Sequence, residues 1–301
     1  MDTVLTTRYG TQTDQTRRLD RFVTVSLVLL GCILYGCATV EQGTPGTEKP
    51  KSERPQLIRT TWPLTLEDEF DGESINTDTW EICESRRRPG PHGHGYWSKE
   101  DAYLDGKGNL VLRARKMDDG INYSSGALRS KGKFEQRYGY FEIRCKLPKE
   151  IGWWTAFWLM SPSETRMGDE GRDGTEIDIF EDFWRDRNWI HHGLHWDGYA
   201  PDHGMARKTV RGLEGIHEGF HTFALEWNEH EYVFYVDDRE TWRTSAGGVS
   251  QVPAYVKVTA EISTRDWAVK FWGIGDPKKA NWPDYFIVDY VKVYKETSDR
   301  N

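Results

Sequence analysis

Apolar and polar residues alternate with a period of two along most of this chain, and this pattern restricts the fold more than any other feature. The runs are short, many end at turn residues, and they lie at 110–114, 223–227, 232–236, 256–262 and 286–291. Because successive side chains of a strand point to opposite faces, such runs predict strands with one buried face. We find no long helical period and no internal repeat. The pattern predicts an all-β fold, an antiparallel β-sandwich of the jelly-roll type.

The beginning of the chain has the features of an export signal. Three arginines within residues 17–21 precede an apolar run at 22–35, which is too short for a comfortable membrane span. The run is followed by Cys37 in LYGC, which resembles a bacterial lipobox and predicts Cys37 as the lipidated residue; Cys32, in LLGC, is the alternative. An uncleaved membrane anchor is the other interpretation. We predict an exported protein at the outer membrane, at the cell surface or in the periplasm, with a lipid anchor as its only membrane contact.

A change in composition marks the start of the folded domain. Residues 41–61 are rich in Gly, Pro, Thr, Lys and Glu and almost lack large apolar side chains, so they cannot bury a core. We expect a monomer with one domain. Its predicted parts are a signal peptide over 1–37, a flexible stalk over 38–60, the folded domain over 61–296 and a disordered tail over 297–301.

Composition and charge narrow the class of ligand. The chain contains 14 Trp and 14 Tyr, whose rings either fill a core or stack on flat apolar ligands such as sugar rings. The formal net charge is -8, and we find no basic stripe other than residues 86–88. Nucleic-acid-binding proteins need clustered Lys and Arg, so we expect a polysaccharide partner and no nucleic acid. An oxidising compartment would permit Cys83 and Cys145 to form a disulfide, but the sequence leaves their pairing open.

The most informative stretch is GTEIDIFE at 174–181, in which carboxylates alternate with large β-forming residues. In an extended strand Glu176 and Asp178 share one face, and Glu181 is out of register by one residue. A β-bulge at residues 179–180 would return Glu181 to the face of the other two carboxylates. We predict this bulge, which gathers three carboxylates in one groove.

Gathered carboxylates suit the hydrolysis of glycosidic bonds. Like charges at short range cannot all ionise freely, so one group keeps its proton to a higher pH. A retaining glycosidase needs an ionised carboxylate that attacks the anomeric carbon and a protonated carboxyl that gives its proton to the leaving oxygen, roughly 5 Å apart. The alternative is a strand with one solvated acidic face. Tryptophans at 153–158 and at 184–196 favour a sugar-binding cleft.

Several spaced motifs resemble family 16 of the glycoside hydrolases. In chain order they are LEDEFDG at 66–72, RSKGKF at 129–134, RYGYFE at 137–142, the Trp-rich stretch at 152–159, EIDIFE at 176–181 and VDYVKVY at 288–294. The resemblance implies a concanavalin A-like jelly roll whose concave face holds the cleft. It also implies that Glu176 is the nucleophile, that Glu181 is the general acid/base, and that Asp178 adjusts the pair by hydrogen bonding.

The resemblance leads us to expect an endo-acting, retaining hydrolase of a β-linked polysaccharide, first of all a β-1,3 or mixed 1,3/1,4 glucan. Members that cleave glucan usually carry an N-x-A-x-G-G run on a late cleft strand, where this chain has TAEIST at 259–264. This departure leaves a marine galactan, such as agar, porphyran or carrageenan, as an alternative, and residues 86–88 or Arg265 would suit a sulfated one. A non-catalytic glycan-binding lipoprotein and a transglycosylase are further alternatives.

Other residues are predicted to line the cleft. Trp153, Trp158, Trp184 and Trp267 are candidates for stacking on sugar rings. His195 is expected beside Glu181 or, alternatively, hydrogen-bonded within the core. We do not expect a zinc site from the histidines at 191, 192 and 195, because adjacent residues of a strand point to opposite faces.

The resemblance also bears on cofactors. It implies that catalysis requires none. It further implies a structural calcium on the convex side, with Asp289 as a ligand and Glu69 as a co-ligand, because an acid among Val288, Tyr290 and Val291 needs a partner.

Overall fold

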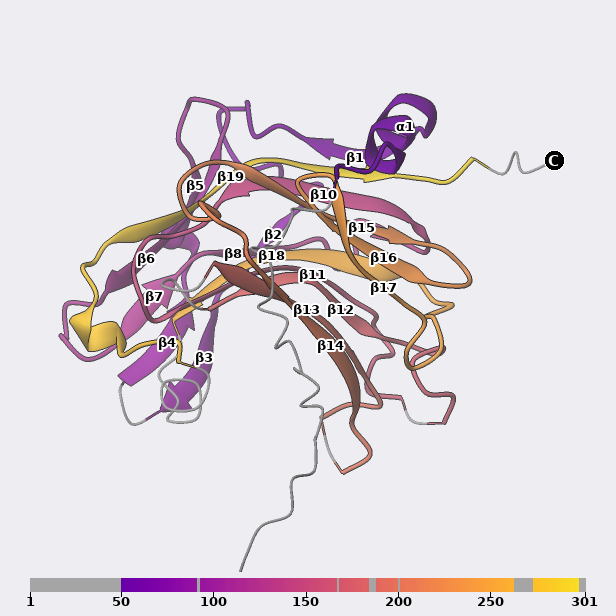
Figure 1. Ribbon diagram of the computed structural model, residues 1–301. Coiled ribbons are helices and arrows are strands. Elements are labelled where there is room, and N and C mark those ends of the chain that lie inside the picture. The colour runs from indigo at the N-terminus through magenta and orange to yellow at the C-terminus, as the bar shows by residue number, and fades with distance from the viewer. Residues whose placement is uncertain are drawn as a thin grey trace, which may run out of the picture. The chain divides into compact units, whose positions relative to one another are not determined.

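The computed structural model describes residues 50–90, 93–166, 168–183, 188–199, 201–262 and 273–297. Within these ranges most regular elements are strands, which form two sheets that pack face to face (Figure 1). The predicted all-β sandwich is therefore confirmed. The predicted export segment, Cys37 and Cys32 lie outside the described residues. No helix among the described residues is long and apolar enough to cross a membrane.

The larger sheet, here sheet A, contains eleven strands within the described residues. In spatial order they are β17 (Arg239–Thr244), β16 (Tyr232–Val236), β15 (His221–Trp227), β10 (Gly139–Lys146), β19 (Asp284–Tyr294), β6 (Leu110–Lys116), β7 (Tyr123–Ser125), β4 (Gly93–Trp97) and β3 (Ser85–Gly90), with β1 (Leu64–Asp68) beside β19 and β5 (Ala102–Leu104) beside β6. Neighbouring strands are antiparallel except for β4 and β7. Within the described ranges the 3-10 helices η1 (Lys99–Asp101) and η3 (Pro277–Lys279) lie in the connections.

The second sheet, sheet B, contains eight strands within the same ranges. In spatial order they are β14 (Gly204–Arg211), β13 (Trp189–Trp196), β12 (Glu176–Asp182), β11 (Trp153–Met160), β18 (Ala254–Ile262), β8 (Ala127–Arg129) and β2 (Glu81–Ile82), with β9 (Glu135–Gln136) beside β18. The acidic segment thus forms β12, an interior strand between β11 and β13.

Alternate side chains of the two sheets meet in one apolar core. Phe141 and Phe223 of sheet A and Phe157, Ile177 and Phe180 of sheet B are all fully buried in it. The rings of Phe180 and Phe223 pack with their centroids 4.2 Å apart. Burial of each such side chain stabilises the fold by roughly 1.5–3 kcal/mol. Because one face of β11 and β12 supplies the core, the other face is free to carry a binding site.

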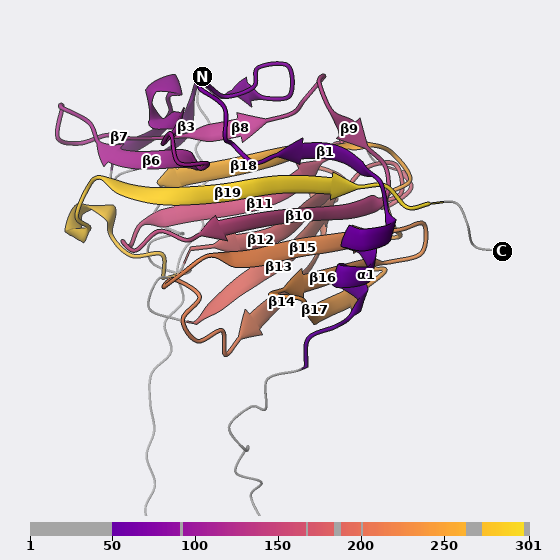
Figure 2. The same ribbon diagram turned by 90° about the horizontal axis from the view of Figure 1, so that it is seen from above.

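A short helix, α1 (Arg54–Thr61), lies on the opposite side of sheet A from the core (Figure 2). Ile58 is fully buried against aromatic side chains of that outer face. Arg54 forms an ion pair with Glu226 at 2.6 Å, and Arg59 forms one with the buried Glu142 at 2.8 Å. The prediction of a flexible stalk as far as residue 60 is therefore wrong for this helix, because these contacts bind it to the domain.

Both cysteines of the described domain are free thiols. Cys83 and Cys145 are buried, and they lie in separate apolar clusters. Burial raises the pKa of each thiol. The sequence left open whether Cys83 and Cys145 form a disulfide. In the structure they do not, and each packs as a small apolar side chain.

Candidate active site

A bulge of one residue in β12 determines where its acidic side chains point. Along β11, the adjacent residues Phe157 and Trp158 pair with Phe180 and Asp178, so that Ile179 has no partner. The register between β12 and β13 shifts by one residue at the same place. Ile179 and Phe180 are both fully buried in the core. The bulge predicted at residues 179–180 is confirmed.

Because of this bulge, Glu176, Asp178 and Glu181 line the same cleft on the exposed face of sheet B. The cleft has a volume of about 680 Å³ and takes its lining from strands β14, β13, β12, β11 and β18, together with β3 and β4. Aromatic side chains in its wall are Trp97, Trp154, Trp158, Phe183 and Tyr199. Acids and aromatic rings thus meet in one groove, as the sequence predicted.

Glu176 is positioned by a tyrosine from the loop after β13. The hydroxyl of Tyr199 donates a hydrogen bond to Oε2 of Glu176 at 2.5 Å. Desolvation and the charge of Glu176 raise the pKa of Tyr199, so the hydroxyl keeps its proton and remains a donor at neutral pH. A hydrogen bond to a carboxylate favours its ionised form, which is the form that a nucleophile needs.

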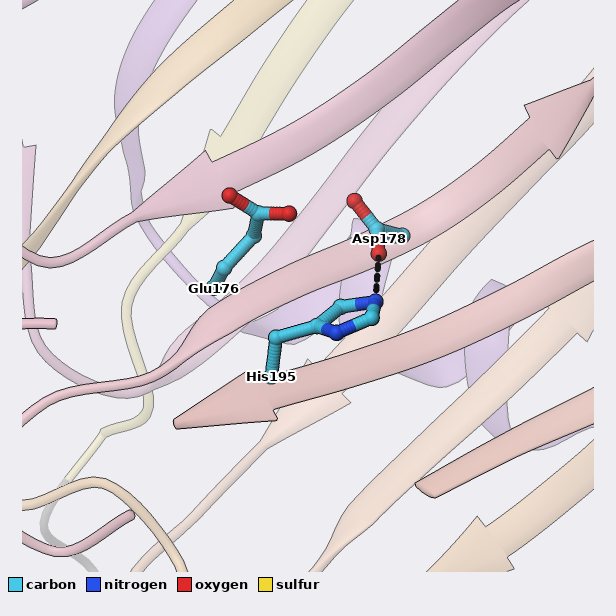
Figure 3. Close-up of side chains that lie close together, drawn as sticks. All are labelled: Glu176, Asp178 and His195. Atoms are coloured by element: carbon cyan, nitrogen blue, oxygen red, sulfur yellow. Dashed lines mark ion pairs between the residues drawn. The ribbon is translucent and has the colours of Figure 1, made fainter. Parts of the chain in front are cut away.

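Asp178 is 3% exposed and lies on the strand between the two glutamates. Its Oδ2 atom is 3.5 Å from Nε2 of His195, whose ring extends from β13 toward it beside Glu176 (Figure 3). Gly193 lies opposite Asp178 and leaves room for it, because a Cβ there would come within 2.5 Å of Oδ2.

His195 meets Asp178 as a neutral ring. Burial, followed by the neighbouring His203 and Arg207, lowers the pKa of His195 to about 4. Its Nδ1 atom lies 2.9 Å from Nε2 of His203, and the two rings stack with centroids 5.1 Å apart. At neutral pH, His195 therefore contacts Asp178 as a neutral ring and adds no positive charge.

Glu181 lies in aromatic surroundings at the other end of the acidic row. Nε1 of Trp154 donates a hydrogen bond to Oε1 of Glu181 at 2.7 Å. Trp154 also packs edge-on against Phe183, which stacks on His191. Burial, with Arg207 and Arg211, lowers the pKa of His191 to about 4, so this ring is neutral as well. Glu181 is thus held in one orientation by Trp154 and surrounded by aromatic rings.

Several predicted cleft residues have other positions. Trp153 is a core residue, 2% exposed, and donates to Asp284, so its predicted role in sugar stacking is wrong. Trp158 does line the cleft. Trp184, Trp267 and Arg265 lie outside the described residues. His195 is a cleft residue, but it pairs in register with Glu176, and His191 pairs with Glu181, so its predicted place beside Glu181 is wrong.

The residues proposed for a calcium site do not fit one. Asp289 forms an ion pair with Arg144, and Glu69 forms one with Lys292 at 2.5 Å. Each carboxylate already has a cationic partner. Among the described residues, Glu176, Asp178 and His195 each offer one atom that could bind a metal ion. These three atoms lie within 4.8 Å of one another. His192 is fully buried, and its ring nitrogens contact Ile179 and Thr241.

The sequence interpretation missed other residues of the cleft. Trp154 and Tyr199 hold the two glutamates, and Trp97, Lys257 and Glu261 form part of the wall. The alternation along β11 could have indicated Trp154, which has the same parity as Trp158. Tyr199 gives no such signal, because it lies in a loop whose path depends on the tertiary fold.

Comparisons with known proteins agree with this geometry. A family model described as "Glycosyl hydrolases family 16" matches residues 92–291. A β-glucanase of Rhodothermus marinus is 28% identical over 261 residues, which cover 78% of this chain and 85% of the relative. A keratan-sulfate endo-1,4-β-galactosidase of Sphingobacterium multivorum is 26% identical over 300 residues, which cover 93% of this chain and 68% of the relative.

A solved structure shows the same architecture. The laminarinase catalytic domain of Thermotoga maritima superposes with a TM-score of 0.64 at 27% identity, covering 79% of this chain and 99% of that domain.

Proposed function

The chain belongs to family 16 of the glycosyl hydrolases and is a glycoside hydrolase, and we propose that it cleaves internal linkages of a β-linked polysaccharide with retention of configuration. The observation that supports this most strongly is the bulge in β12, which brings Glu181 to the face of Glu176 and Asp178. A double displacement requires two carboxyl groups that flank the scissile bond, roughly 5 Å apart, and both glutamates line this cleft.

The proposed reaction has two steps. Glu176 attacks the anomeric carbon while Glu181 gives its proton to the leaving oxygen, so the glycosidic C–O bond breaks as a glycosyl ester with Glu176 forms. Glu181 then removes a proton from a water molecule, which attacks the anomeric carbon and releases Glu176 as a carboxylate. Asp178 stands between them and, through its contact with His195, keeps a fixed orientation. This sequence of steps needs no cofactor.

The shape of the cleft supports an endo mode of action. Its wall is built from five neighbouring strands of sheet B, in the order β14, β13, β12, β11 and β18. A groove across a sheet accepts the middle of a polymer, with Trp154 and Trp158 as surfaces for apolar sugar faces. A sugar hydroxyl in place of water would give transglycosylation on the same residues.

A β-1,3 or mixed 1,3/1,4 glucan is the first proposed substrate. It is supported by the relatives named β-glucanase and laminarinase. A galactan is the second candidate. Two observations support it. The match to the keratan-sulfate endo-1,4-β-galactosidase covers 93% of this chain. The cleft wall contains two charged residues, Lys257 and Glu261.

A polymer panel tests the proposed activity. The protein and its Glu176→Gln variant would be incubated with laminarin, lichenan, agarose, porphyran and carrageenans, and reducing ends measured. Glu73→Gln, an exposed glutamate far along the chain from β12, is the matched control. We expect one class of polymer to be cut by the wild type and by the control but not by Glu176→Gln. Binding without cleavage in all three would instead identify a glycan-binding protein.

We further propose that the enzyme is exported and attached to a membrane through a lipid on Cys37. The support is the lipobox-like sequence after the apolar run at 22–35. Metabolic labelling with a fatty acid would detect the lipid, and Cys37→Ala should abolish the label while Cys32→Ala should not.

A further inference from the structure

A lysine in the wall of the cleft lacks an anionic hydrogen-bonding partner. Lys257 lies on β18 and is 7% exposed. Its Nζ atom is 3.6 Å from the ring centroid of Trp158 and 5.5 Å from that of Trp97. Within the described part of the chain, no carboxylate or carbonyl accepts a hydrogen bond from it. Because Lys257 lines the cleft, water or a ligand in the cleft must supply the acceptors for its ammonium group.

The charges around this position come from Arg87, Glu261 and Glu176. Arg87 lies over the other ring, with its Cζ atom 3.9 Å from the centroid of Trp97, and its guanidinium is 3.3 Å from Glu261. Glu176 is the carboxylate whose negative charge raises the pKa of Lys257, and burial opposes this effect. Burial lowers the pKa of Lys257 to about 8, so most molecules carry the charge at neutral pH.

The backbone of Lys257 is set apart from the backbone of the acidic strand. Asp178 pairs with Trp158, and Trp158 pairs with Lys257, so all three lie in one row across sheet B. Two strand spacings separate the backbones of Asp178 and Lys257, which is roughly 10 Å. A bound chain that crosses the strands would therefore place one sugar at the acids and another at Lys257.

We propose that Lys257, together with the rings of Trp158 and Trp97, forms a subsite for a sugar that carries an anionic group, either a sulfate ester or a carboxylate. The inference rests on the proposed function of the cleft as a polysaccharide site. The ammonium group supplies three donors to the anion, and the rings of Trp158 and Trp97 hold it in place by cation–π contacts. The substrate class is accordingly an anionic β-glycan, which favours the galactan candidate over a neutral glucan.

Two other roles for Lys257 are tested by the same experiment. The lysine could serve only to pack on Trp158, in which case Met, of similar length, would replace it without effect on ligands. It could instead stabilise the negative charge of Glu176, which in turn raises the pKa of Lys257. That role would affect the rate with every polymer to the same degree and would not distinguish anionic from neutral ones.

Affinity electrophoresis with matched polymers measures the preference directly. Native gels would contain porphyran or its desulfated form, and β-linked glucuronan or its carboxyl-reduced form. The protein would be compared with Lys257→Met, Lys257→Arg and Arg207→Met, the last of which removes an exposed charge from the same cleft. The readout is the ratio of the dissociation constants for the neutral and the anionic form of each polymer, at low and at high salt.

We expect the wild type to bind at least one anionic polymer about tenfold more tightly than its neutral form, which corresponds to roughly 1.4 kcal/mol. This ratio should fall to about one in Lys257→Met, persist in Lys257→Arg and change little in Arg207→Met. The sulfate and carboxylate pairs identify which anion is bound. A ratio of one in the wild type, an unchanged ratio in Lys257→Met, or an equal loss in Arg207→Met would overturn the proposal.

Hydrolysis of the same polymers keeps the two proposals separate. Cleavage without preference for an anionic form would refute the subsite and leave the proposed function intact. Retardation that depends on Lys257 without any cleavage would refute the proposed function and leave the subsite intact.

Discussion

At the level of single residues, the hydrogen bond from Trp154 to Glu181 gives a direct prediction. Trp154→Phe would keep an aromatic ring against Phe183 but remove the Nε1 donor, which lies 2.7 Å from Oε1 of Glu181. Hydrogen bonds to charged groups contribute about 1.5–3 kcal/mol, so we expect kcat to fall roughly tenfold or more while KM changes less. Steady-state kinetics on the polymer that the enzyme cleaves would give both constants.

Trp158→Phe is the matched control on the same strand. Its Nε1 atom also donates a hydrogen bond at 3.0 Å, but to Thr259 in the cleft wall. We therefore expect this variant to raise KM more than it lowers kcat. Identical profiles for the two variants would show that Trp154 has no separate role toward Glu181.

The two tryptophans also show what the sequence could predict at this scale. Trp153 and Trp158 differ in parity, so a regular strand cannot point both into the cleft. The alternation could have indicated Trp154 and Trp158 as the pair on one face. Tyr199 and His203 could not be placed in this way, because their contacts with Glu176 and His195 arise from a loop.

Among the elements, β12 owes its chemistry to one extra residue. Deletion of Ile179 would restore regular alternation and still leave Glu181 on the face of Glu176, whereas insertion of one Ala after Phe180, with the bulge kept, would turn Glu181 toward the core. We expect the insertion to reduce activity by roughly 10²-fold or more, which is the loss expected for Glu181→Gln. The deletion variant should retain more activity than the insertion variant and more than Glu181→Gln. Reducing-end assays with thermal melting would compare the three; an insertion variant more active than the deletion would contradict this explanation.

Helix α1 is the second element with a testable role. Arg59→Ala would leave Glu142, which is 1% exposed at its side chain, without its cationic partner. Removing one member of a buried ion pair costs about 3–5 kcal/mol, so the free energy of unfolding should fall by that order. Chemical denaturation would measure it. The double variant Arg59→Ala/Glu142→Gln should be more stable than Arg59→Ala, and the opposite order would contradict a role for this ion pair.

This helix also marks a limit of sequence interpretation. The stretch around it is polar, and its composition correctly predicts that it has no core of its own. Its stability comes from Ile58 and from ion pairs with Glu142 and Glu226, which are distant in the sequence. Contacts of this kind depend on the finished sheet, and composition does not reveal them.

For the whole molecule, buried histidines predict how stability depends on pH. Burial lowers the pKa of His192 from 6.5 to about 3, so the folded state keeps this ring neutral while the unfolded state binds a proton. Stability is therefore complete above about pH 6.5 and is lost as the pH falls toward 3. At pH 5 the loss is about 2 kcal/mol for one fully buried histidine. Urea unfolding at pH 7 and pH 5 would measure it. His192→Gln should reduce the difference between the two pH values; an unchanged difference would contradict the assignment.

The sandwich, the bulge and the acidic row followed from local patterns, because strand parity and turn residues are encoded over a few positions. The family resemblance and the family match agree on this region. The cationic part of the cleft did not follow from the sequence, because Lys257 joins Trp158 and Trp97 only when β18, β11 and β4 come together. The substrate class depends on that assembly and is correspondingly the part that needs experiment.

The configuration of the first product shows whether Glu176 and Glu181 act as nucleophile and acid/base in a double displacement. Proton NMR of the anomeric region, recorded during the first minutes of hydrolysis of a β-linked polymer, would show which anomer forms before mutarotation. The account predicts that the β-anomer appears first, and an α-anomer as the initial product would contradict it.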